Sequence, residues 1–490
     1  MRYSFLLCSC LTLFVTFARA QKIKYNKQTN DSIYQVETHL SERYQIKGEN
    51  HGSLSERMAF HNVKAVSIAV IKNYQIVWAK GYGWADESLK IPTTSSTRFQ
   101  AASVSKSINA VALLKLVQDG KIDLNADINS TLKTWKFPYD TVSKGKKISL
   151  ANLLSHNAGI SVHGFGGYAI GNPIPNLVQI LNGTAPANSA PVKSITAPGT
   201  GFEYSGGGIT ISQMMAIDAS GVSYETLLHD QVLSPYGMTN STFEQGVGRN
   251  KLKQLATAYR KDGSEVEGKH HIYPELAAAG LWTTPTDLAK YVINTQLSHQ
   301  GKSNKVLNRK TAELMLTPIV EDEVGLGVFI RNLDGTKYFE HSGSNEGFQS
   351  EYYGSFESGN GVVVMVNSDN GKIIPEIVNS VAQVYDFKGL YRSKLIDKIE
   401  IPTSTLLKYV GDYQFAPTAI FKISLENGQL YMKPDDRDKT PVYPEAINKF
   451  YLKQTDAQIE FVKNADGNFN TLVLTQGSNI QKAERVTATQ

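Results

Sequence analysis

Cysteine is almost absent from this chain of 490 residues, and the shortage excludes several kinds of site. The two cysteines, Cys8 and Cys10, both lie near the N-terminus, inside a stretch with the pattern of a cleavable export signal. Removal of that stretch leaves a protein without thiols. We therefore expect no disulfide, no cysteine nucleophile and no cysteine-bound metal in the mature chain.

Apolar runs long enough to cross a membrane are missing as well. The run Phe5–Phe17 follows the positive charge of Arg2 and precedes the small-residue site Ala18-Arg19-Ala20, an order typical of a signal peptide over residues 1–20. It is short for a membrane span, and no later stretch reaches the roughly 18 apolar residues that a span needs. We expect an exported protein, periplasmic or secreted, without a transmembrane span. A lipid anchor through Cys8 or Cys10 is the alternative.

Charge of one sign is not concentrated anywhere. The chain has 50 Lys and Arg against 45 Asp and Glu, a formal net charge of +5, and its basic residues gather only in short clusters such as Lys144–Lys147. A nucleic-acid-binding protein usually carries a basic stripe or a recognisable module, and neither is present. We predict no nucleic-acid partner.

Several motifs of other enzyme classes are also lacking. The chain has no Gly-x-Ser-x-Gly elbow, and Gly301-Lys302-Ser303 lacks the upstream glycine of a phosphate-binding loop. His270-His271 has no carboxylate at the spacing of a zinc motif, so we interpret it as surface loop. The scattered Asp and Glu residues show no pairing that singles out a glycosidase. We predict no metal and no cofactor.

The composition and the order of elements predict two folded units. With 41% hydrophobic and 19% charged residues the chain has material for a core, and its length exceeds one ordinary domain. For residues 21–395 we predict an α/β (α+β) fold, in which an antiparallel sheet split in sequence is flanked by helices and interrupted by an all-α region. The predicted elements are a helical pattern at Ser32–Arg43, a hairpin of Val66–Ile71 and Ile76–Lys80, helices near Leu150–Ser155, Ile209–Ser220, Tyr224–Leu233 and Pro285–Gln296, and strands at Gly325–Arg331, Lys337–His341, Gln349–Ser355 and Gly361–Asn367.

The tail, residues 396–490, has a different pattern. Short strand-like runs follow each other with turn signals at Glu426-Asn427-Gly428 and Ala465-Asp466-Gly467. This spacing suits a small antiparallel barrel or sandwich, which we predict as a separate domain. The runs are Ala419–Leu425, Gln429–Lys433, Phe450–Lys453, Gln458–Lys463 and Thr471–Thr475.

One stretch carries an arrangement suited to nucleophilic catalysis. Ser103-Val104-Ser105-Lys106 opens an apolar run, Ile108–Val117, which is closed by Asp119-Gly120 and is typical of a buried helix. Residues three apart share a face of a helix, so Ser103 and Lys106 are expected side by side in the first turn. A serine hydroxyl needs a base to remove its proton, and a neighbouring lysine amine can supply one.

Three further places compete for a role beside Ser103. Tyr204 lies in a glycine-rich loop before an apolar helix and could take part in acid–base steps, although most tyrosines only pack their rings. At His341-Ser342-Gly343-Ser344, small residues would let a substrate backbone lie close, but a histidine in a strand is more often a packing residue. His156, within Leu154–Gly159, could equally mark a helix end with a glycine stop.

Taken in this order, the motifs resemble those of the serine penicillin-recognising hydrolases. The family is that of the class C β-lactamases and D-Ala-D-Ala peptidases, which also includes esterases and D-aminopeptidases. The resemblance covers roughly residues 50 to 390, and the tail resembles the lipocalin-like barrel often appended to such hydrolases. It rests on Ser103-Val104-Ser105-Lys106, Tyr204-Ser205-Gly206 and His341-Ser342-Gly343, supported by Leu153–Gly159, Ser234–Met238 and Ala278–Leu288.

The resemblance implies a site and a mechanism. Ser103 would form an acyl-enzyme with a small-molecule or peptide substrate, Lys106 and Tyr204 would share the proton transfers, and water would release the acid. The backbone N–H groups of Ser103 and Ser344 would bind the oxyanion, with Gly343 allowing close approach and His341 orienting the substrate.

Two departures from the family pattern bear on the substrate. Gly206 stands where β-lactam-hydrolysing members usually have Asn, and His341 stands where they have Lys. Histidine is mostly neutral near pH 7, which weakens the binding of a substrate carboxylate. The chain therefore fits an esterase, amidase or aminopeptidase-like hydrolase better than a true β-lactamase or D-Ala-D-Ala carboxypeptidase, which stay as alternatives. A non-catalytic protein that binds cell-wall fragments is the rival of another class, and the sequence leaves the oligomeric state open.

Overall fold

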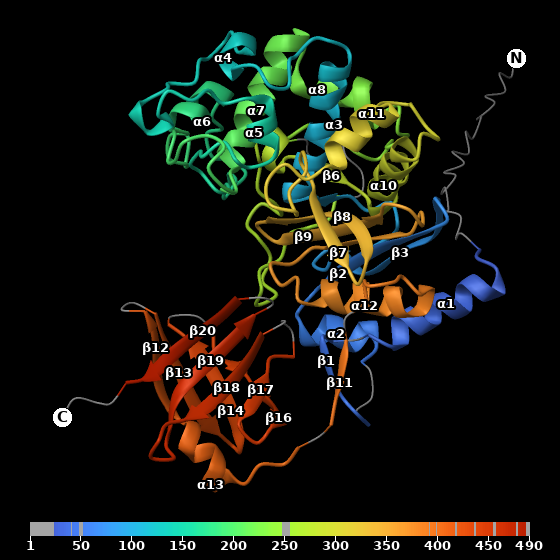
Figure 1. The fold of residues 1–490 in the computed structure, drawn as a ribbon. Coiled ribbons are helices and arrows are strands. Elements are labelled where there is room, and N and C mark those ends of the chain that lie inside the picture. Colours follow the sequence, from blue (N-terminus) through green and yellow to red (C-terminus); the bar gives the residue numbers. More distant parts are fainter. Residues whose placement is uncertain are drawn as a thin grey trace, which may run out of the picture.

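A computed structural model describes most of the chain, and Figure 1 shows it as a sheet between two layers of helices with a β-structure at the C-terminal end. The residues that the structure describes are 24–40, 42–48, 52–246, 255–391, 393–397, 399–416, 419–435, 438–453, 457–476 and 479–486. The predicted signal peptide, residues 1–20, and both cysteines lie outside them.

The central sheet is antiparallel and combines early and late strands of residues 21–395, as predicted. Its order is β4-β3-β2-β10-β9-β8-β7, so the N-terminal hairpin β2–β3 lies beside β10, which comes much later in the chain. Asn73 and Tyr74 have φ of 53° and 62°, the two left-handed residues that a tight hairpin turn needs. The strands are β2 (Ala65–Lys72), β3 (Gln75–Asp86), β4 (Ile91–Pro92), β7 (Phe329–Leu333), β8 (Thr336–Asn345), β9 (Phe348–Ser355) and β10 (Gly361–Val366).

The strand bounds differ from the prediction in three main places, the first being β8, which continues past His341 to Asn345. β3 continues through Gly81–Trp84, which the sequence placed after the strand, and β7 begins at Phe329 rather than at Gly325. Gly327 adopts a positive φ of 74°, which breaks an extended strand, and its carbonyl accepts the Ser107 hydroxyl. The segment before Phe329 is therefore a bend that contacts the helix containing Ser107.

One face of the sheet packs against the predicted helical region. The core on this side holds Ala69 of β2 together with Ile108 and Leu113 of α3, whose apolar residues are buried on every face. The helices are α3 (Ser105–Gln118), α4 (Ile128–Thr131), α5 (Leu150–Leu154), α6 (Leu177–Asn182), α7 (Gly206–Ser220), α8 (Tyr224–Leu228), α9 (Leu276–Ala279), α10 (Pro285–His299) and α11 (Arg309–Leu316). A single-turn 3₁₀ helix, Ala102–Val104, precedes α3, and the two-residue strands β5 (Phe99–Gln100) and β6 (Trp282–Thr283) pair beside it.

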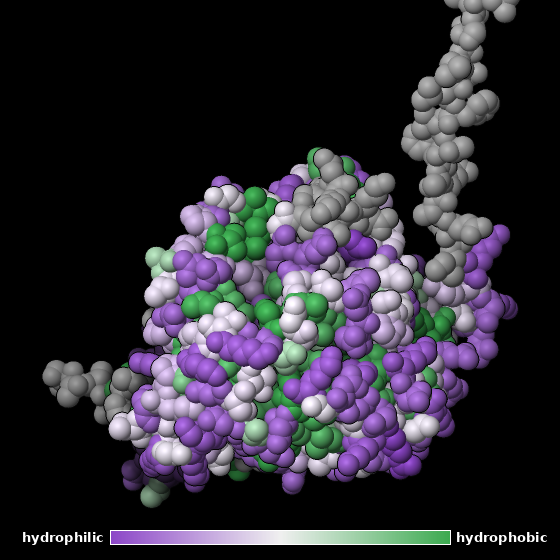
Figure 2. All heavy atoms as spheres, turned by 90° about the horizontal axis from the view of Figure 1, so that it is seen from above, coloured by the Kyte–Doolittle hydropathy of each residue, from purple (hydrophilic) through white to green (hydrophobic). Residues whose placement is uncertain are grey.

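Seen from the helical side, the surface is mostly hydrophilic and is interrupted by apolar patches (Figure 2). Within the described part of the chain, no helix has both the length and the apolar character to cross a membrane.

Three helices cover the other face of the sheet: α1 (Lys27–Thr38), α2 (Leu54–Phe60) and α12 (Ile373–Tyr385) (Figure 1). The helix α1 starts earlier than the pattern at Ser32–Arg43 predicted, because the Asn26 side chain accepts the Thr29 N–H and caps it. The sequence analysis did not predict α2 or α12. The helix α2 has only seven residues. In α12 the residues Ile373, Ile377 and Val381 do recur at helical spacing, a signal that the sequence analysis overlooked.

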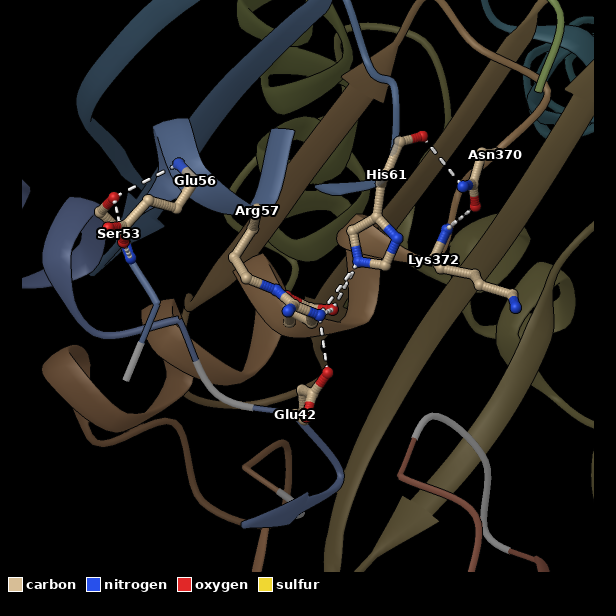
Figure 3. Close-up of polar contacts among 8 residues, drawn as sticks. Glu42, Ser53, Glu56, Arg57, His61, Asn370 and Lys372 are labelled. Atoms are coloured by element: carbon tan, nitrogen blue, oxygen red, sulfur yellow. Dashed lines mark hydrogen bonds and ion pairs between the residues drawn. The ribbon is translucent and has the colours of Figure 1, made fainter. Parts of the chain in front are cut away.

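A buried ion-pair network joins α2 to α12 (Figure 3). Arg57 donates to both carboxylate oxygens of Glu376, at 2.7 Å each, and to Glu42 at 2.6 Å, and the His61 ring nitrogen lies 2.8 Å from Glu376. The Asn370 amide donates to the His61 carbonyl at 3.0 Å. The residue after Asn370, Gly371, lines the cavity described below.

The C-terminal part is a nine-stranded, nearly closed antiparallel barrel with its own core, as the tail pattern predicted. Its order, β15-β14-β13-β12-β20-β19-β18-β17-β16, leaves the two short end strands unpaired with each other. The parallel pair β1 (Tyr44–Ile46) and β11 (Lys394–Ile396) lies where the chain leaves the first unit. The barrel elements are α13 (Thr403–Leu406), β12 (Gly411–Ala416), β13 (Ala419–Glu426), β14 (Gln429–Pro434), β15 (Thr440–Pro441), β16 (Tyr443–Ala446), β17 (Lys449–Tyr451), β18 (Ala457–Lys463), β19 (Phe469–Gln476) and β20 (Asn479–Arg485).

Candidate active site

Ser103 lies in the 3₁₀ turn that leads into α3, not in the first turn of the α-helix as expected. The preceding residue, Ala102, has φ of +49°, a left-handed conformation that costs an alanine about 1 to 2 kcal/mol. The predicted pairing is nevertheless present, since Lys106 Nζ donates to Ser103 Oγ at 2.8 Å. The structure thus brings the amine to the hydroxyl within one turn.

Lys106 is buried, with 2% of its surface exposed, and its ammonium has a second fixed partner. Lys106 Nζ donates to the carbonyl of Ala278 at 2.7 Å and lies 5.2 Å from the centre of the Tyr204 ring. Ala278 belongs to α9, which the sequence analysis noted only as a supporting stretch. These contacts hold the amine at the serine rather than leaving it free to rotate.

Tyr204 enters the site directly before α7. Ser205 caps this helix by accepting the Gly208 N–H at 2.8 Å, and Gly207 allows the loop to pass close to Ser161, because a Cβ there would meet the Ser161 carbonyl at 2.8 Å. The glycine run therefore allows the loop to pack closely, and this packing fixes where Tyr204 enters the cleft.

His156 supports the Tyr204 loop. Its Nδ1 accepts the Ser205 N–H at 3.2 Å, and its ring lies 4.3 Å from the Tyr204 ring, centre to centre. Burial lowers the pKa of His156 well below its usual value, and the charge of Lys106 adds to this effect. The residue is therefore a neutral positioning group at neutral pH, and not only the helix end that the sequence also allowed.

The third motif lies on β8, which approaches the nucleophile turn at Gly343. A Cβ at Gly343 would stand 2.3 Å from the Ala101 carbonyl oxygen and 2.8 Å from the Ser103 nitrogen, so only glycine permits this approach. The strand β7 pairs with Thr336–Glu340 only, and along the described chain no strand continues beside the rest of β8 on that side. Asn345 closes the hairpin with Phe348, and bonding alternates along an antiparallel strand, so Ser344 directs its N–H to this open edge.

His341 lies on the face of β8 that looks toward α3. Its Nδ1 is 2.6 Å from the Ser342 carbonyl, which can only accept, so Nδ1 carries the proton and Nε2 is an acceptor. That Nε2 is buried and has no hydrogen-bond partner among the described residues. Burial lowers the pKa of His341 to about 3, and the charge of Lys106 contributes, so the imidazole is neutral across the ordinary pH range.

These residues line one cavity of about 670 Å³. All six predicted site residues are among its lining: Ser103, Lys106, Tyr204, His341, Gly343 and Ser344. The sequence analysis missed a group of aromatic residues that also line it, namely His163, Phe165, Phe202 and Phe329. They come from separate loops and a strand start, and no spacing in the sequence relates them to one another.

The cavity also contains charged residues that the sequence did not identify. Arg331 donates to Glu340 at 3.0 Å, and Glu351 lines the cavity beside them. Burial raises the pKa of Glu340 to about 7, and Glu351 raises it further while Arg331 opposes the rise. In the part of the chain that the structure covers, no group of three or more His, Cys, Asp or Glu side chains could hold a metal ion.

Comparison with known proteins shows which family has a similar sequence. The β-lactamase family model matches residues 53–375, and a domain of unknown function (DUF3471) matches residues 396–487. Protein flp of Staphylococcus aureus (strain MRSA252) is 27% identical over 361 residues, which are 71% of this chain and 66% of that protein. The putative penicillin-binding protein PbpX of Bacillus subtilis (strain 168) is 26% identical over 322 residues, 64% of this chain and 73% of that one. The chain thus spans about two thirds of the length of the Staphylococcus relative.

Solved structures agree on the fold. The octameric penicillin-binding protein homologue from Pyrococcus abyssi has a TM-score of 0.61 at 23% identity, over 88% of this chain and 98% of that one. Since the β-lactamase model matches well over half of the residues, the chain belongs to the β-lactamase family, and its lysine-paired serine lies in the cleft.

Proposed function

We propose that this protein is an exported hydrolase that cleaves an ester, amide or peptide bond through an acyl-enzyme on Ser103. The observation that carries the proposal is the 2.8 Å contact between Lys106 Nζ and Ser103 Oγ at the foot of a cavity beside an open strand edge. A buried amine that Ala278 holds against the Ser103 hydroxyl can exchange a proton with it, which a lysine that only packs cannot do.

The steps follow from the positions of the groups. Ser103 Oγ attacks the carbonyl carbon while its proton passes to the pair of Lys106 and Tyr204, and the Ser103 and Ser344 N–H groups stabilise the oxyanion. The tetrahedral intermediate collapses by breaking the bond to the leaving group, which receives a proton through Lys106 and Tyr204. Water then attacks the acyl-enzyme with the same groups in reverse order, and the acid and free Ser103 are formed.

The neutral His341 bears on the choice of substrate. An imidazole with a pKa of about 3 is not a cation near pH 7, so it gives a substrate carboxylate no ion pair. This favours an ester, amide or aminopeptidase-like substrate over a β-lactam or a D-Ala-D-Ala peptide, the alternatives within the same family. High turnover of nitrocefin by the purified protein would contradict this preference.

The test of the proposed function uses the mature protein and two readouts. We expect hydrolysis of a short-chain nitrophenyl ester and formation of a Ser103 adduct with a serine-directed phosphonate, detected by mass spectrometry. S103A should lose both. If wild type and S103A hydrolyse the ester equally and no adduct forms, the rival reading of a non-catalytic protein for cell-wall fragments takes precedence.

The proposed export of the protein rests on the signal pattern of residues 1–20 alone. Expression of the full chain followed by N-terminal sequencing of the product checks it. Cleavage before Gln21 is the expected result, and a product that retains Met1 in the cytoplasm contradicts it.

A further inference from the structure

Large aromatic side chains are exposed inside the cavity beside the catalytic groups. Phe202 is 38% exposed although it lines the cavity. Its ring lies 6.1 Å from the Phe329 ring, which stacks at 15° on Tyr204 with centres 6.5 Å apart. Apolar surface left open to water inside a cavity is typical of a ligand-binding surface. We call Phe202 and Phe329 the aromatic wall.

The charged groups next to the aromatic wall do not favour an anion. The Arg331 guanidinium lies over the Phe329 ring at 5.6 Å, but it is already paired with Glu340 at 3.0 Å and with Glu323. Glu351 lines the same end of the cavity. A substrate carboxylate placed here would find the Arg331 guanidinium already engaged by two carboxyl groups.

One buried polar atom at the aromatic wall has no partner. The His341 ring packs on Phe329 with centres 5.3 Å apart, and its Nε2 is a hydrogen-bond acceptor without a partner among the described residues. A buried acceptor without a donor is unfavourable in the free protein, and a substrate N–H or O–H would satisfy it. The wall therefore offers apolar contact beside a neutral imidazole with an unsatisfied acceptor.

The position of Tyr204 decides which part of the substrate meets this surface. In the proposed mechanism Lys106 and Tyr204 return the proton to the departing group, so that group leaves beside Tyr204. The aromatic wall continues directly from the Tyr204 ring through Phe329 to Phe202. The group that is expelled, rather than the acyl group, is the part that lies against it.

We propose that the leaving group of the natural substrate is uncharged and carries an aromatic or comparable apolar group, which binds against Phe202 and Phe329 next to the acceptor of His341. This inference rests on the proposed function and specifies its substrate. In acylation the bond from Ser103 Oγ to the carbonyl carbon forms, the bond from that carbon to the leaving oxygen or nitrogen breaks, and the Ser103 proton ends on the released alcohol or amine.

The experiment varies only the leaving group. Ethyl butyrate, 2-phenylethyl butyrate and the butyrate ester of glycolate share one acyl-enzyme, so differences in kcat/KM report acylation and leaving-group binding. Each value is divided by the rate of hydroxide-catalysed hydrolysis of the same ester. We expect the 2-phenylethyl ester to exceed the ethyl ester by roughly 10- to 100-fold, and the anionic glycolate ester to be the poorest of the three.

Two variants of Phe202 test whether the aromatic wall causes the preference for the 2-phenylethyl ester. F202S should lower the ratio of the 2-phenylethyl to the ethyl ester by roughly 3- to 10-fold. F202L keeps an apolar side chain but removes the ring, and it serves as the second variant if F202S does not fold. F60S is the matched control, because Phe60 is 66% exposed on α2, outside the cavity, and should leave the ratio unchanged.

The outcomes are distinct. Equal normalised rates for the neutral esters, a preference for the glycolate ester, or a ratio unchanged in both Phe202 variants overturns the inference while the proposed function stands. Absence of turnover of all three esters together with an unlabelled Ser103 overturns the proposed function, and the inference falls with it. The expected preference, lost in F202S and kept in F60S, supports both.

Discussion

The two walls of the cavity are built in different ways. On the nucleophile side, Ser103, Lys106 and Ala278 come from a 3₁₀ turn and two helices of the main core, and the Lys106 ammonium has two fixed hydrogen-bond partners. On the opposite side, Phe202 and Phe329 are partly exposed and contact mainly other rings. One wall is fixed by directional bonds and burial, and the other only by apolar contact.

This difference teaches where change is tolerated. Hydrogen bonds in a buried site fail when one partner moves by a fraction of an ångström, whereas apolar contact surfaces tolerate substitution of similar volume. Variants on the nucleophile side should therefore reduce turnover of every substrate, and variants on the aromatic side should alter the relative rates of different substrates.

The largest effect is expected from K106M. The substitution removes the base and the hydrogen bonds to Ser103 and Ala278 while keeping a chain of similar length, so kcat should fall by roughly 100- to 10,000-fold. Ester hydrolysis measures it. K115M, on the partly exposed side of the same helix, is the control, and an equal loss in both variants would show that helix stability rather than proton transfer is responsible.

Next in size is G343A. A Cβ at this position would lie 2.3 Å from the Ala101 carbonyl oxygen, so β8 and the Ser103 turn must separate, and with them the two N–H groups that we propose as the oxyanion donors. We expect a roughly 100- to 1,000-fold fall in kcat, the size of a lost oxyanion donor. G201A is the matched control, since nothing lies within 4 Å of the position of its Cβ. Full activity of G343A would contradict the placement of the oxyanion site.

The stability of the folded protein should depend on pH through Glu275. Its carboxylate precedes α9, is completely buried and has no hydrogen-bond partner in the described structure, and burial raises its pKa to about 7 from 4.5. The folded state therefore holds the proton more tightly than the unfolded chain. The resulting stability is fully present below pH 4.5 and is lost as the pH rises through about 7.

E275Q removes this pH dependence. Its free energy of unfolding should match wild type near pH 4 and exceed it by roughly 3 kcal/mol at pH 9. Urea denaturation at both pH values is the measurement, with E267Q on an exposed loop as the control. A difference that is the same at both pH values would mean that the carboxyl charge is not responsible.

The smallest effect is expected from H341K, which tests the aromatic side by giving it a cation. We expect the ratio of kcat/KM for the glycolate ester to that for ethyl butyrate to rise by about 10-fold, the value of one charge-assisted hydrogen bond. His229 directly follows α8 and its side chain is 65% exposed, so H229K should leave the ratio unchanged. A fall in the ratio for H341K would contradict the role of His341 in excluding anions.

Residues linked by local spacing could be predicted from the sequence, and residues that meet only in three dimensions could not. Ser103 and Lys106 are three apart, so any helical turn brings them together. The order of the three motifs in the chain then indicated the family and the other site residues. The 3₁₀ turn at Ala102 was missed because a left-handed alanine has no sequence signal. Phe202 and Phe329 were missed because they are far apart in the chain and each is an ordinary apolar residue by itself.

The same distinction holds for the fold. The split sheet followed from two early β-rich runs that are separated by a short turn and from late apolar strands of clear length. The helix α12 was missed although its sequence carries the signal, since Ile373, Ile377 and Val381 recur four residues apart and form one apolar face.

The pairing of β2 with β10 has a consequence for how the chain reaches its native state. Val66 pairs with Val366, and the whole helical region lies between them. An apolar strand edge on β2 must wait for its partner until almost all of the first unit has been synthesised, and loop closure over such a distance is slow. The N-terminal hairpin is therefore the segment most in need of protection from association with other chains while the protein folds.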